Sequence, residues 1–195
     1  MFIKTSEKIT NYLIQSDIIK YDDREIYRYG VQQGLTGVLN FVTTLFIGIL
    51  FRMTWESIVF TVAYIPLRHY AGGFHAKTPI RCYFFSIAII TAALLAMRYI
   101  PWTNLICGIT LLLSMICIIL FSPVETANKP LDDIEKNVYR KRSYYVAVTE
   151  ISIIFSAFIM KFSRLMVCLI VMFLVMSVML VLGKVKSKIT PKYIS

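Results

Sequence analysis

The sequence predicts an all-α integral membrane protein: a polytopic bundle of about six transmembrane helices with an amphipathic helix at its N-terminus. Hydrophobic residues make up 57% of the 195 residues and charged residues only 16%. This is more apolar than soluble domains of similar size. Long apolar runs also recur along the chain, and about 20 apolar residues are enough to cross a ~30 Å hydrocarbon core. We therefore expect residues 1–195 to form a single integral membrane domain.

The net charge of +10 would indicate a nucleic-acid partner in a soluble chain. In a membrane protein, an excess of Lys and Arg instead marks the loops that face the cytoplasm. We therefore expect no nucleic-acid partner. The four cysteines show no CxxC pairing, and the two histidines lack the HExxH spacing of a zinc protease. We expect neither a metal nor another cofactor.

The first 20 residues place apolar side chains at helical spacing among lysines and one aspartate. This pattern is typical of a helix that lies in the membrane interface with its lysines toward anionic headgroups. It fits equally well a helix packed on the rest of the protein. We assign residues 1–30 to a cytoplasmic or interfacial amphipathic segment.

Six candidate spans follow this segment. Four of them approach the length that crosses a bilayer, and a fifth would qualify apart from Glu150. The second candidate has an uncharged core that is short enough to be re-entrant. The candidates are residues 31–51, 57–67, 82–97, 105–121, 144–160 and 165–182.

Charge counting favours six spans with both termini in the cytoplasm. This arrangement places 17 of the 21 basic residues inside and leaves Arg52, Arg98, Lys161 and Arg164 outside. Removing the second span would put most basic residues outside, against the positive-inside bias. The sequence thus predicts a multi-pass protein of the cell membrane, with residues 68–82 on the cytoplasmic side.

Residues 68–82 are the stretch where we expect chemistry. Thr78 and Pro79 are typical of a helix start, because threonine is a favoured N-cap and proline suits the first helical position. Cys82 would then lie in the first helical turn, where the positive end of the helix dipole favours a thiolate. His75, just upstream in a loop, could fold back to act as its base.

Further residues of this stretch would support such a site. Arg68, Lys77 and Arg81 add positive potential near the thiol, and the Gly72–Gly73 pair loosens the loop. The plainer interpretation is that a cysteine at the start of a membrane helix only packs. On spacing alone that interpretation is the commoner one, because His-x6-Cys is no general motif.

Residues 68–76, with the sequence RHYAGGFHA, and the following Cys82 resemble the signature of the accessory gene regulator B family. These are membrane endopeptidases that process quorum-sensing peptide precursors in Gram-positive bacteria. Residues 122–130, SPVETANKP, are similar to the Asn-Lys-Pro loop that the family carries after its fourth hydrophobic segment. The resemblance covers nearly the whole chain.

The resemblance implies that Cys82 is the nucleophile and His75 its general base, and that Arg68 and Gly73 help to build the site. In this family the thiolate attacks the precursor on the cytoplasmic side, releases an acidic C-terminal tail and holds the peptide as a thioester. A cysteine of the peptide then closes a thiolactone ring, giving the autoinducing peptide. The implied partners are an AgrD-like precursor and a second copy of the chain in a homodimer.

Glu150 is a candidate by default, because carboxylates within membrane spans are uncommon and usually functional. It could orient His75, bind a basic group of the substrate, or pair with Arg140 or Arg142. We favour the structural role slightly. The basic run at residues 140–142 could likewise attract an acidic tail, but anchoring to lipid headgroups is the commoner role of such a cluster.

Two classes of function stay open from the sequence. One is a cysteine endopeptidase that acts on a small peptide, with the membrane surface helping to gather it. The other is a non-catalytic transporter or scaffold for such a peptide, in which Cys82 only packs. Replacing Cys82 with serine separates them, because a thiol protease needs an accessible thiolate.

Overall fold

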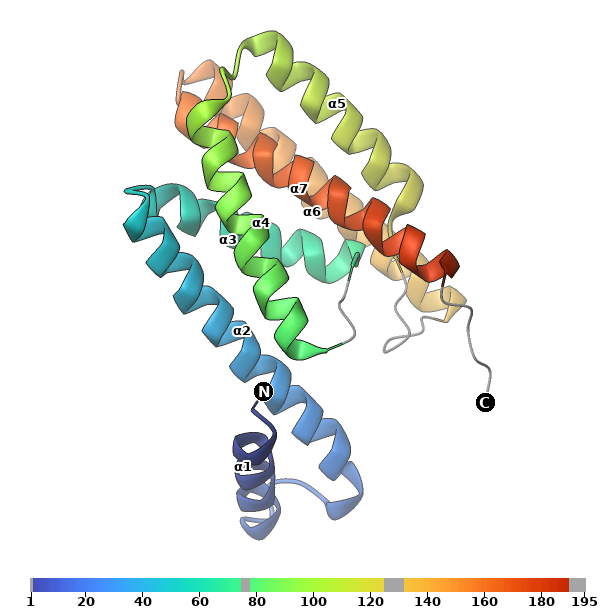
Figure 1. The fold of residues 1–195 in the computed structure, drawn as a ribbon. Coiled ribbons are helices and arrows are strands. Elements are labelled where there is room, and N and C mark those ends of the chain that lie inside the picture. Colours follow the sequence, from blue (N-terminus) through green and yellow to red (C-terminus); the bar gives the residue numbers. More distant parts are fainter. Residues whose placement is uncertain (1, 75–77, 125–131, 190–195) are drawn as a thin grey trace.

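The computed structural model describes residues 2–74, 78–124 and 132–189. Over these residues the chain forms seven α-helices and a short 3-10 helix, without a β-strand, so the predicted all-α class is confirmed (Figure 1). The elements are α1 (Ile3–Gln15), η1 (Tyr21–Asp23), α2 (Arg24–Leu50), α3 (Thr54–Ala71), α4 (Pro79–Tyr99), α5 (Asn104–Phe121), α6 (Asp133–Ile159) and α7 (Ser163–Ile189).

Three of the helices begin at capping residues that the sequence supplies. The side chains of Thr78 and Thr103 each accept a hydrogen bond from a main-chain N–H in the first turn of α4 and α5. Asp132 forms a capping box with Glu135 at the start of α6. Such caps satisfy N–H groups that a helix leaves without partners at its N-terminus.

The helices run between two ends of the bundle. At one end, which we call the three-connection end, residues in or beside the α2–α3 and α4–α5 connections and at the start of α7, just after the α6–α7 connection, line a common pocket. At the other end, the N–H of Val124, just after α5, donates to the carbonyl oxygen of Ala71, the last residue of α3. The N–H of Phe74 donates to Met179, in the C-terminal half of α7. Helix α3 therefore traverses the bundle from the pocket to the opposite end (Figure 1).

Among the described residues, five helices are long and apolar enough to cross a membrane: α2, α4, α5, α6 and α7. Helix α3 does not meet that standard, because Glu56, Arg68 and His69 lie within its 18 residues. It nevertheless connects the two ends, as the second predicted span should. Large apolar side chains such as Leu120 (68% exposed) and Phe155 (63% exposed) face outward. A multi-pass membrane protein is expected to present such a surface to lipid.

Helix α7 is the centre of the bundle. It contacts α3, α4, α5 and α6, and 61% of its most apolar segment is buried, against 17% to 28% for the other four spanning candidates. Seven consecutive residues, from Cys168 to Leu174, include only one that is exposed. A helix that is apolar on all sides is expected at such a central position.

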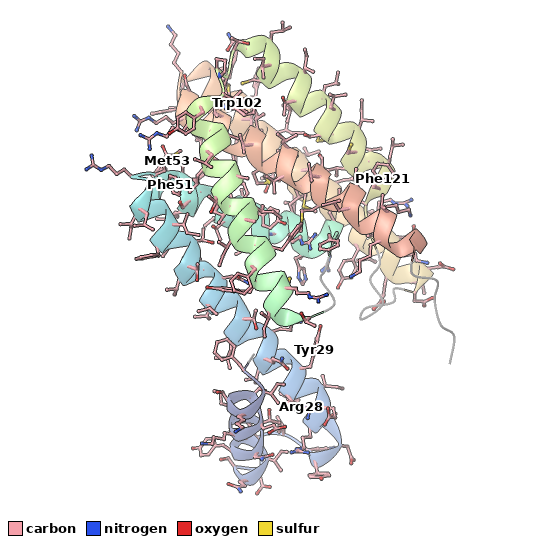
Figure 2. The ribbon with its side chains drawn as sticks, in the orientation of Figure 1. Arg28, Tyr29, Phe51, Met53, Trp102 and Phe121 are labelled. Atoms are coloured by element: carbon pink, nitrogen blue, oxygen red, sulfur yellow. The ribbon has the colours of Figure 1, made fainter. Side chains whose placement is uncertain are left out.

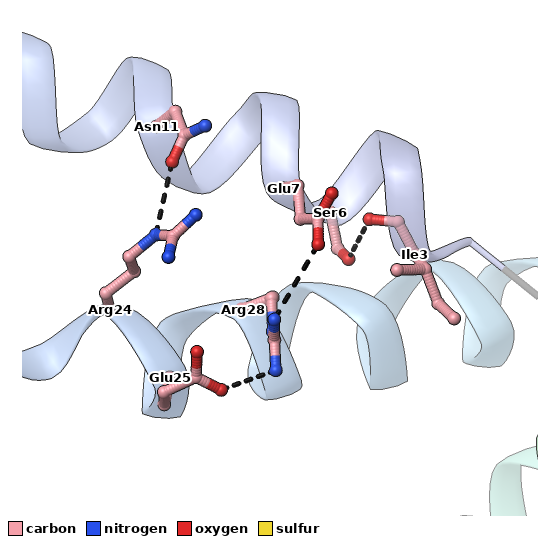
Figure 3. Close-up of polar contacts among 7 residues, drawn as sticks. All are labelled: Ile3, Ser6, Glu7, Asn11, Arg24, Glu25 and Arg28. Carbon is pink, nitrogen blue, oxygen red and sulfur yellow. Dashed lines mark hydrogen bonds and ion pairs between the residues drawn. The ribbon is translucent and has the colours of Figure 1, made fainter.

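Helix α1 packs on the first half of α2 (Figure 3). Ser6 and Thr10 are the fully buried residues of α1, and a guanidinium nitrogen of Arg28 lies 3.7 Å from a carboxylate oxygen of Glu7. The larger apolar side chains remain exposed, among them Ile3 (54%) and Tyr12 (67%). Helix α1 thus packs on the protein through its small residues and leaves an apolar face uncovered.

One expected helix end at the N-terminus was wrong, because α1 ends at Gln15 and not near residue 20. Helix α2 begins at Arg24, before the apolar run that starts at residue 31. The early start of α2 has a physical reason. Arg28 bonds Glu25 of the same helix at 2.5 Å, which stabilises the first turns of α2, and Arg24 donates to Asn11 of α1 at 3.3 Å, which ties these turns to α1.

Candidate functional site

Most residues of the predicted site are described, but two are not. His75 and Lys77 lie outside the described residues, as does most of the second motif, residues 125–131. The described candidates are Arg68, Gly72, Gly73, Arg81, Cys82 and Glu150.

Arg68, in the last turn of α3, holds the chain that follows its own helix. One of its terminal nitrogens donates to the carbonyl oxygen of Gly72 at 2.8 Å, and the other donates to the carbonyl oxygen of Phe74. The planar guanidinium suits this task, because its donors diverge in a fixed fork. Arg68 therefore fixes the path of the main chain between α3 and the residues that precede α4.

The Gly–Gly pair makes this path possible. Gly72 and Gly73 have φ angles of +74° and +127°, which side chains disfavour. A Cβ atom at Gly73 would overlap the guanidinium of Arg68, and one at Gly72 would overlap the carbonyl oxygen of Val124. Gly72 also pairs with Val124 in an isolated parallel bridge. The pair is thus needed here for close approach, not for looseness as the sequence suggested.

Helix α7 supplies the wall against which this turn lies. The N–H of Phe74 donates to the carbonyl oxygen of Met179 at 2.9 Å. One turn later, a Cβ atom added to Gly183 would come within 2.7 Å of the carbonyl carbon of Gly73. The absence of a side chain at Gly183 therefore lets the turn approach the helix closely. In the sequence, the one feature that could have indicated this contact is the single glycine, Gly183, at the end of the last apolar run.

Cys82 is a free, half-buried thiol in the first turn of α4. Its N–H donates to the carbonyl oxygen of Thr78 at 3.0 Å, and Thr78 caps the helix by accepting from the N–H of Arg81 at 3.4 Å. The predicted helix start at Thr78 and Pro79 is confirmed. A thiol in this turn lies close to the positive end of the helix dipole.

Tyr64 lies near both Arg68 and Cys82. It lies on α3 one turn before Arg68, and its hydroxyl is within electrostatic range of the Arg68 guanidinium and the Cys82 thiol. Tyr64 was not among the predicted site residues, although its position four residues before Arg68 places both on one face of a helix. Together, Tyr64, Arg68, Cys82 and the Gly–Gly turn form what we call the thiol site.

The start of α4 is held in place by two neighbours. The hydroxyl of Tyr83, next to Cys82, shares a hydrogen bond of 2.9 Å with Thr43 of α2. The rings of Phe74 and Phe85 are in contact, with centroids 4.9 Å apart. These contacts tie α4 both to α2 and to the turn that Arg68 holds.

Glu150 is buried in α6, with 5% of its surface exposed. Its Oε2 atom has no hydrogen-bond partner among the described residues. The pairing with Arg140 or Arg142 is not formed. Arg140 donates to the carbonyl oxygen of Ser122 at 3.2 Å, and the guanidinium of Arg142 lies over the ring of Tyr70, 5.6 Å from its centroid. No hydrogen bond or ion pair among the described residues joins Glu150 to the thiol site.

Within the described ranges, no three His, Cys, Asp or Glu side chains lie together as metal ligands would. Arg81 is exposed and forms no ion pair with a described carboxylate. The described part of the site thus offers a thiol, one cation fixed on main-chain oxygens and one free cation. This combination suits nucleophilic chemistry on a carbonyl group.

Comparisons with known proteins agree with the motifs. The family model described as Accessory gene regulator B matches residues 6–181. An AgrB-like protein of Listeria welshimeri is 29% identical over 132 residues, which cover 66% of this chain and 64% of that protein. An AgrB-like protein of Clostridium perfringens is 25% identical over 149 residues, 72% of this chain and 69% of that protein. No solved structure matches the chain.

Proposed function

The chain belongs to the accessory gene regulator B family, and from this premise we propose that it is a membrane cysteine endopeptidase. It cleaves the C-terminal tail from an AgrD-like quorum-sensing precursor and promotes closure of a thiolactone ring in the remaining peptide. Cys82 is the nucleophile and His75 the general base. The observation that carries this proposal is the free thiol of Cys82 in the first turn of a capped helix.

The reaction balances without a cofactor. The Cys82 thiolate attacks the carbonyl carbon of the scissile bond, a C–S bond forms, and the C–N bond to the tail breaks. The proton that His75 took from the thiol passes to the departing amine. A thiol of the peptide then gives its proton to His75 and attacks the Cys82 thioester, which forms the C–S bond of the ring, breaks the C–S bond to Cys82 and returns the Cys82 thiolate. Exchange of one thioester for another roughly conserves bond energy, whereas hydrolysis would lose it.

Arg68 acts as a positioning residue in this account. Its terminal nitrogens bond the carbonyl oxygens of Gly72 and Phe74, so the cation fixes the chain that leads into His75. Phe74 is bonded in turn to α7 through Met179. A base that must reach the Cys82 thiol within hydrogen-bond distance needs such a fixed approach, because small displacements reduce catalysis strongly.

The surroundings of Cys82 support ring closure over hydrolysis. The thiol is half-buried at the end of a bundle whose outer surface is apolar. Exclusion of water from such a site would leave the peptide thiol as the main acceptor of the acyl group. Purified protein that releases mainly linear peptide, with an intact thiol, would contradict this part of the proposal.

Topology and partners follow the same proposal. The thiol site and both termini face the cytoplasm of a Gram-positive bacterium, where the precursor is made, and Listeria and Clostridium supply the relatives described above. The uncovered apolar face of α1 lies in the membrane interface and helps to gather an amphipathic peptide. A homodimer is supported by Gly30, Gly34 and Gly37 of α2, beside which the structure leaves open space.

The experiment that tests this proposal compares two cysteine variants. Cys82→Ser should abolish processing of an AgrD-like precursor in proteoliposomes, because serine offers no accessible anion there. Cys117→Ser is the matched control, since Cys117 is also a half-buried free thiol in an apolar helix, and it should process normally. Full function of a well-folded Cys82→Ser variant would instead support a transporter or scaffold.

A further inference from the structure

A second polar site lies at the three-connection end of the bundle, away from Cys82. Residues in or beside the α2–α3 and α4–α5 connections and in the first turns of α7 line a cavity of about 480 Å³ there. Phe51, Met53 and Trp102, which belong to its lining, gather at one end of the bundle in Figure 2, whereas Phe121 marks the other end. We call this cavity the arginine pocket.

One arginine in or beside each of the three connections lines the pocket: Arg52 between α2 and α3, Arg98 in the last turn of α4 and Arg164 in the first turn of α7. Only one carboxylate, that of Glu56, lines it among the described residues. None of the three arginines forms an ion pair with a described carboxylate. Among the described residues, the side chain of Arg98 donates one long hydrogen bond of 3.4 Å, to the carbonyl oxygen of Phe51, and its guanidinium lies over the ring of Tyr99, 5.8 Å from the centroid. The pocket therefore holds an excess of positive charge whose donors are largely unused.

The remaining lining is apolar, which restricts the kind of anion that fits. Met53, Met97 and Trp102 line the pocket and pack against the buried core. The indole N–H of Trp102 is already bonded to the carbonyl oxygen of Ala96 at 3.0 Å, so the indole presents mainly ring surface. A small hydrated anion would gain nothing from these groups.

The position of the pocket at the ends of the helices indicates that its ligand is a lipid. It lies where six helices end or begin, which is the boundary between hydrocarbon and headgroups in a multi-pass protein. Tryptophan is enriched at this boundary, and arginines there meet phosphate groups. We propose that the arginine pocket binds the headgroup of an anionic phospholipid from the leaflet opposite the thiol site. The guanidiniums hold the phosphate, and the methionines and Trp102 contact the glycerol and upper acyl carbons.

The backbone at Arg52 allows a test that does not disturb the fold. Arg52 has a φ angle of +56°, a conformation in which glycine is the favoured residue. Arg52→Gly therefore removes the guanidinium and relieves the backbone. Lys161 is the matched control: it has a φ angle of +58° after α6 and does not line the pocket. Both variants should unfold within a few degrees of the wild type.

Binding is measured by native mass spectrometry of the full chain in detergent, with added phosphatidylglycerol or phosphatidylcholine. We expect the wild type and Lys161→Gly to retain phosphatidylglycerol in preference to phosphatidylcholine. Arg52→Gly should weaken that retention about fivefold, because one basic group near a headgroup contributes roughly that factor. Adding Arg98→Gln and Arg164→Gln should abolish the preference.

Quenching of tryptophan fluorescence gives a second readout in bilayers. In a Trp55→Phe background Trp102 is the remaining tryptophan of the chain. Brominated phosphatidylglycerol, present as a minor lipid among phosphatidylcholine, should quench it more strongly in the wild-type pocket than in Arg52→Gly. Equal retention by Arg52→Gly and Lys161→Gly, or equal quenching with and without Arg52, would overturn the proposal.

Discussion

The guanidinium of Arg68 lies 2.8 Å from the carbonyl oxygen of Gly72, so the last turn of α3 is bonded to the chain that leaves it. The same cation bonds Phe74, which is also bonded to α7. An arginine at the end of a membrane helix would ordinarily reach toward headgroups. Here it organises the approach to the thiol site, and several consequences can be measured.

Replacing Arg68 with lysine should impair processing while the chain still inserts and folds. Lysine has one ammonium group and cannot bond the carbonyl oxygens of Gly72 and Phe74 in the same forked geometry. A carbonyl left without its partner costs about 1–3 kcal/mol when buried. We expect the processing rate in proteoliposomes to fall at least about tenfold, which is roughly 1.4 kcal/mol of transition-state stabilisation.

Arg81→Lys is the control for this substitution, since Arg81 is exposed and bonds no described carboxylate through its side chain. It should keep most of the wild-type rate. If Arg68→Lys processed the precursor as fast as Arg81→Lys, the positioning role of Arg68 would be wrong.

Gly183→Ala should destabilise the protein. The new methyl group would come within 2.7 Å of Gly73 and 2.8 Å of the N–H nitrogen of Phe74, and both atoms belong to the main chain. Overpacking of this kind typically costs about 1–3 kcal/mol. The melting temperature in detergent should fall, and processing should fall with it because the turn before His75 is displaced.

Gly108→Ala is the control, and we expect it to change the stability of the protein in the opposite direction. No atom lies within 4 Å of the position that its Cβ would take, and alanine is favoured over glycine within a helix by about 1 kcal/mol. Its melting temperature should stay level or rise. Equal melting temperatures for the two variants would show that α7 does not support the turn closely.

Glu150→Gln should leave processing unchanged. Glu150 is buried, and among the described residues its Oε2 atom has no hydrogen-bond partner and no ion pair links its carboxylate to the thiol site. Glutamine has nearly the same shape and carries no charge, so its burial is less costly than that of a carboxylate. The kinetics of precursor cleavage check this expectation, and a loss of more than about tenfold would assign Glu150 a role in the reaction.

Much of the fold follows from local sequence signals. The apolar runs and the Thr78–Pro79 start of α4 are properties of contiguous residues. Among the described residues, five of the six predicted spans are long and apolar enough to cross a membrane, and the second, which corresponds to α3, is not. The extent of α3 was underestimated because Glu56 and Arg68 lie at its ends, where long polar side chains can reach water. The uncharged run of residues is therefore shorter than the helix that contains it.

The thiol site was predicted less completely. Cys82 and Arg68 were singled out through their motif, but the contacts of the Gly72–Gly73 turn with Val124 and Gly183 were not, because these residues are distant from the turn in sequence. The packing of α1 through Ser6 and Thr10 was missed for a related reason. Hydrophobic periodicity identifies an apolar face, whereas here the small polar face makes the contact.

The central claim, that Cys82 forms an acyl-enzyme, is tested most directly by intact-mass analysis after incubation with an AgrD-like precursor. The wild type should gain the mass of the precursor minus its C-terminal tail. Cys117→Ala should gain the same mass, and Cys82→Ala should gain none. A wild-type protein that binds the precursor but leaves it uncleaved and forms no adduct would contradict the account and indicate a transporter or scaffold.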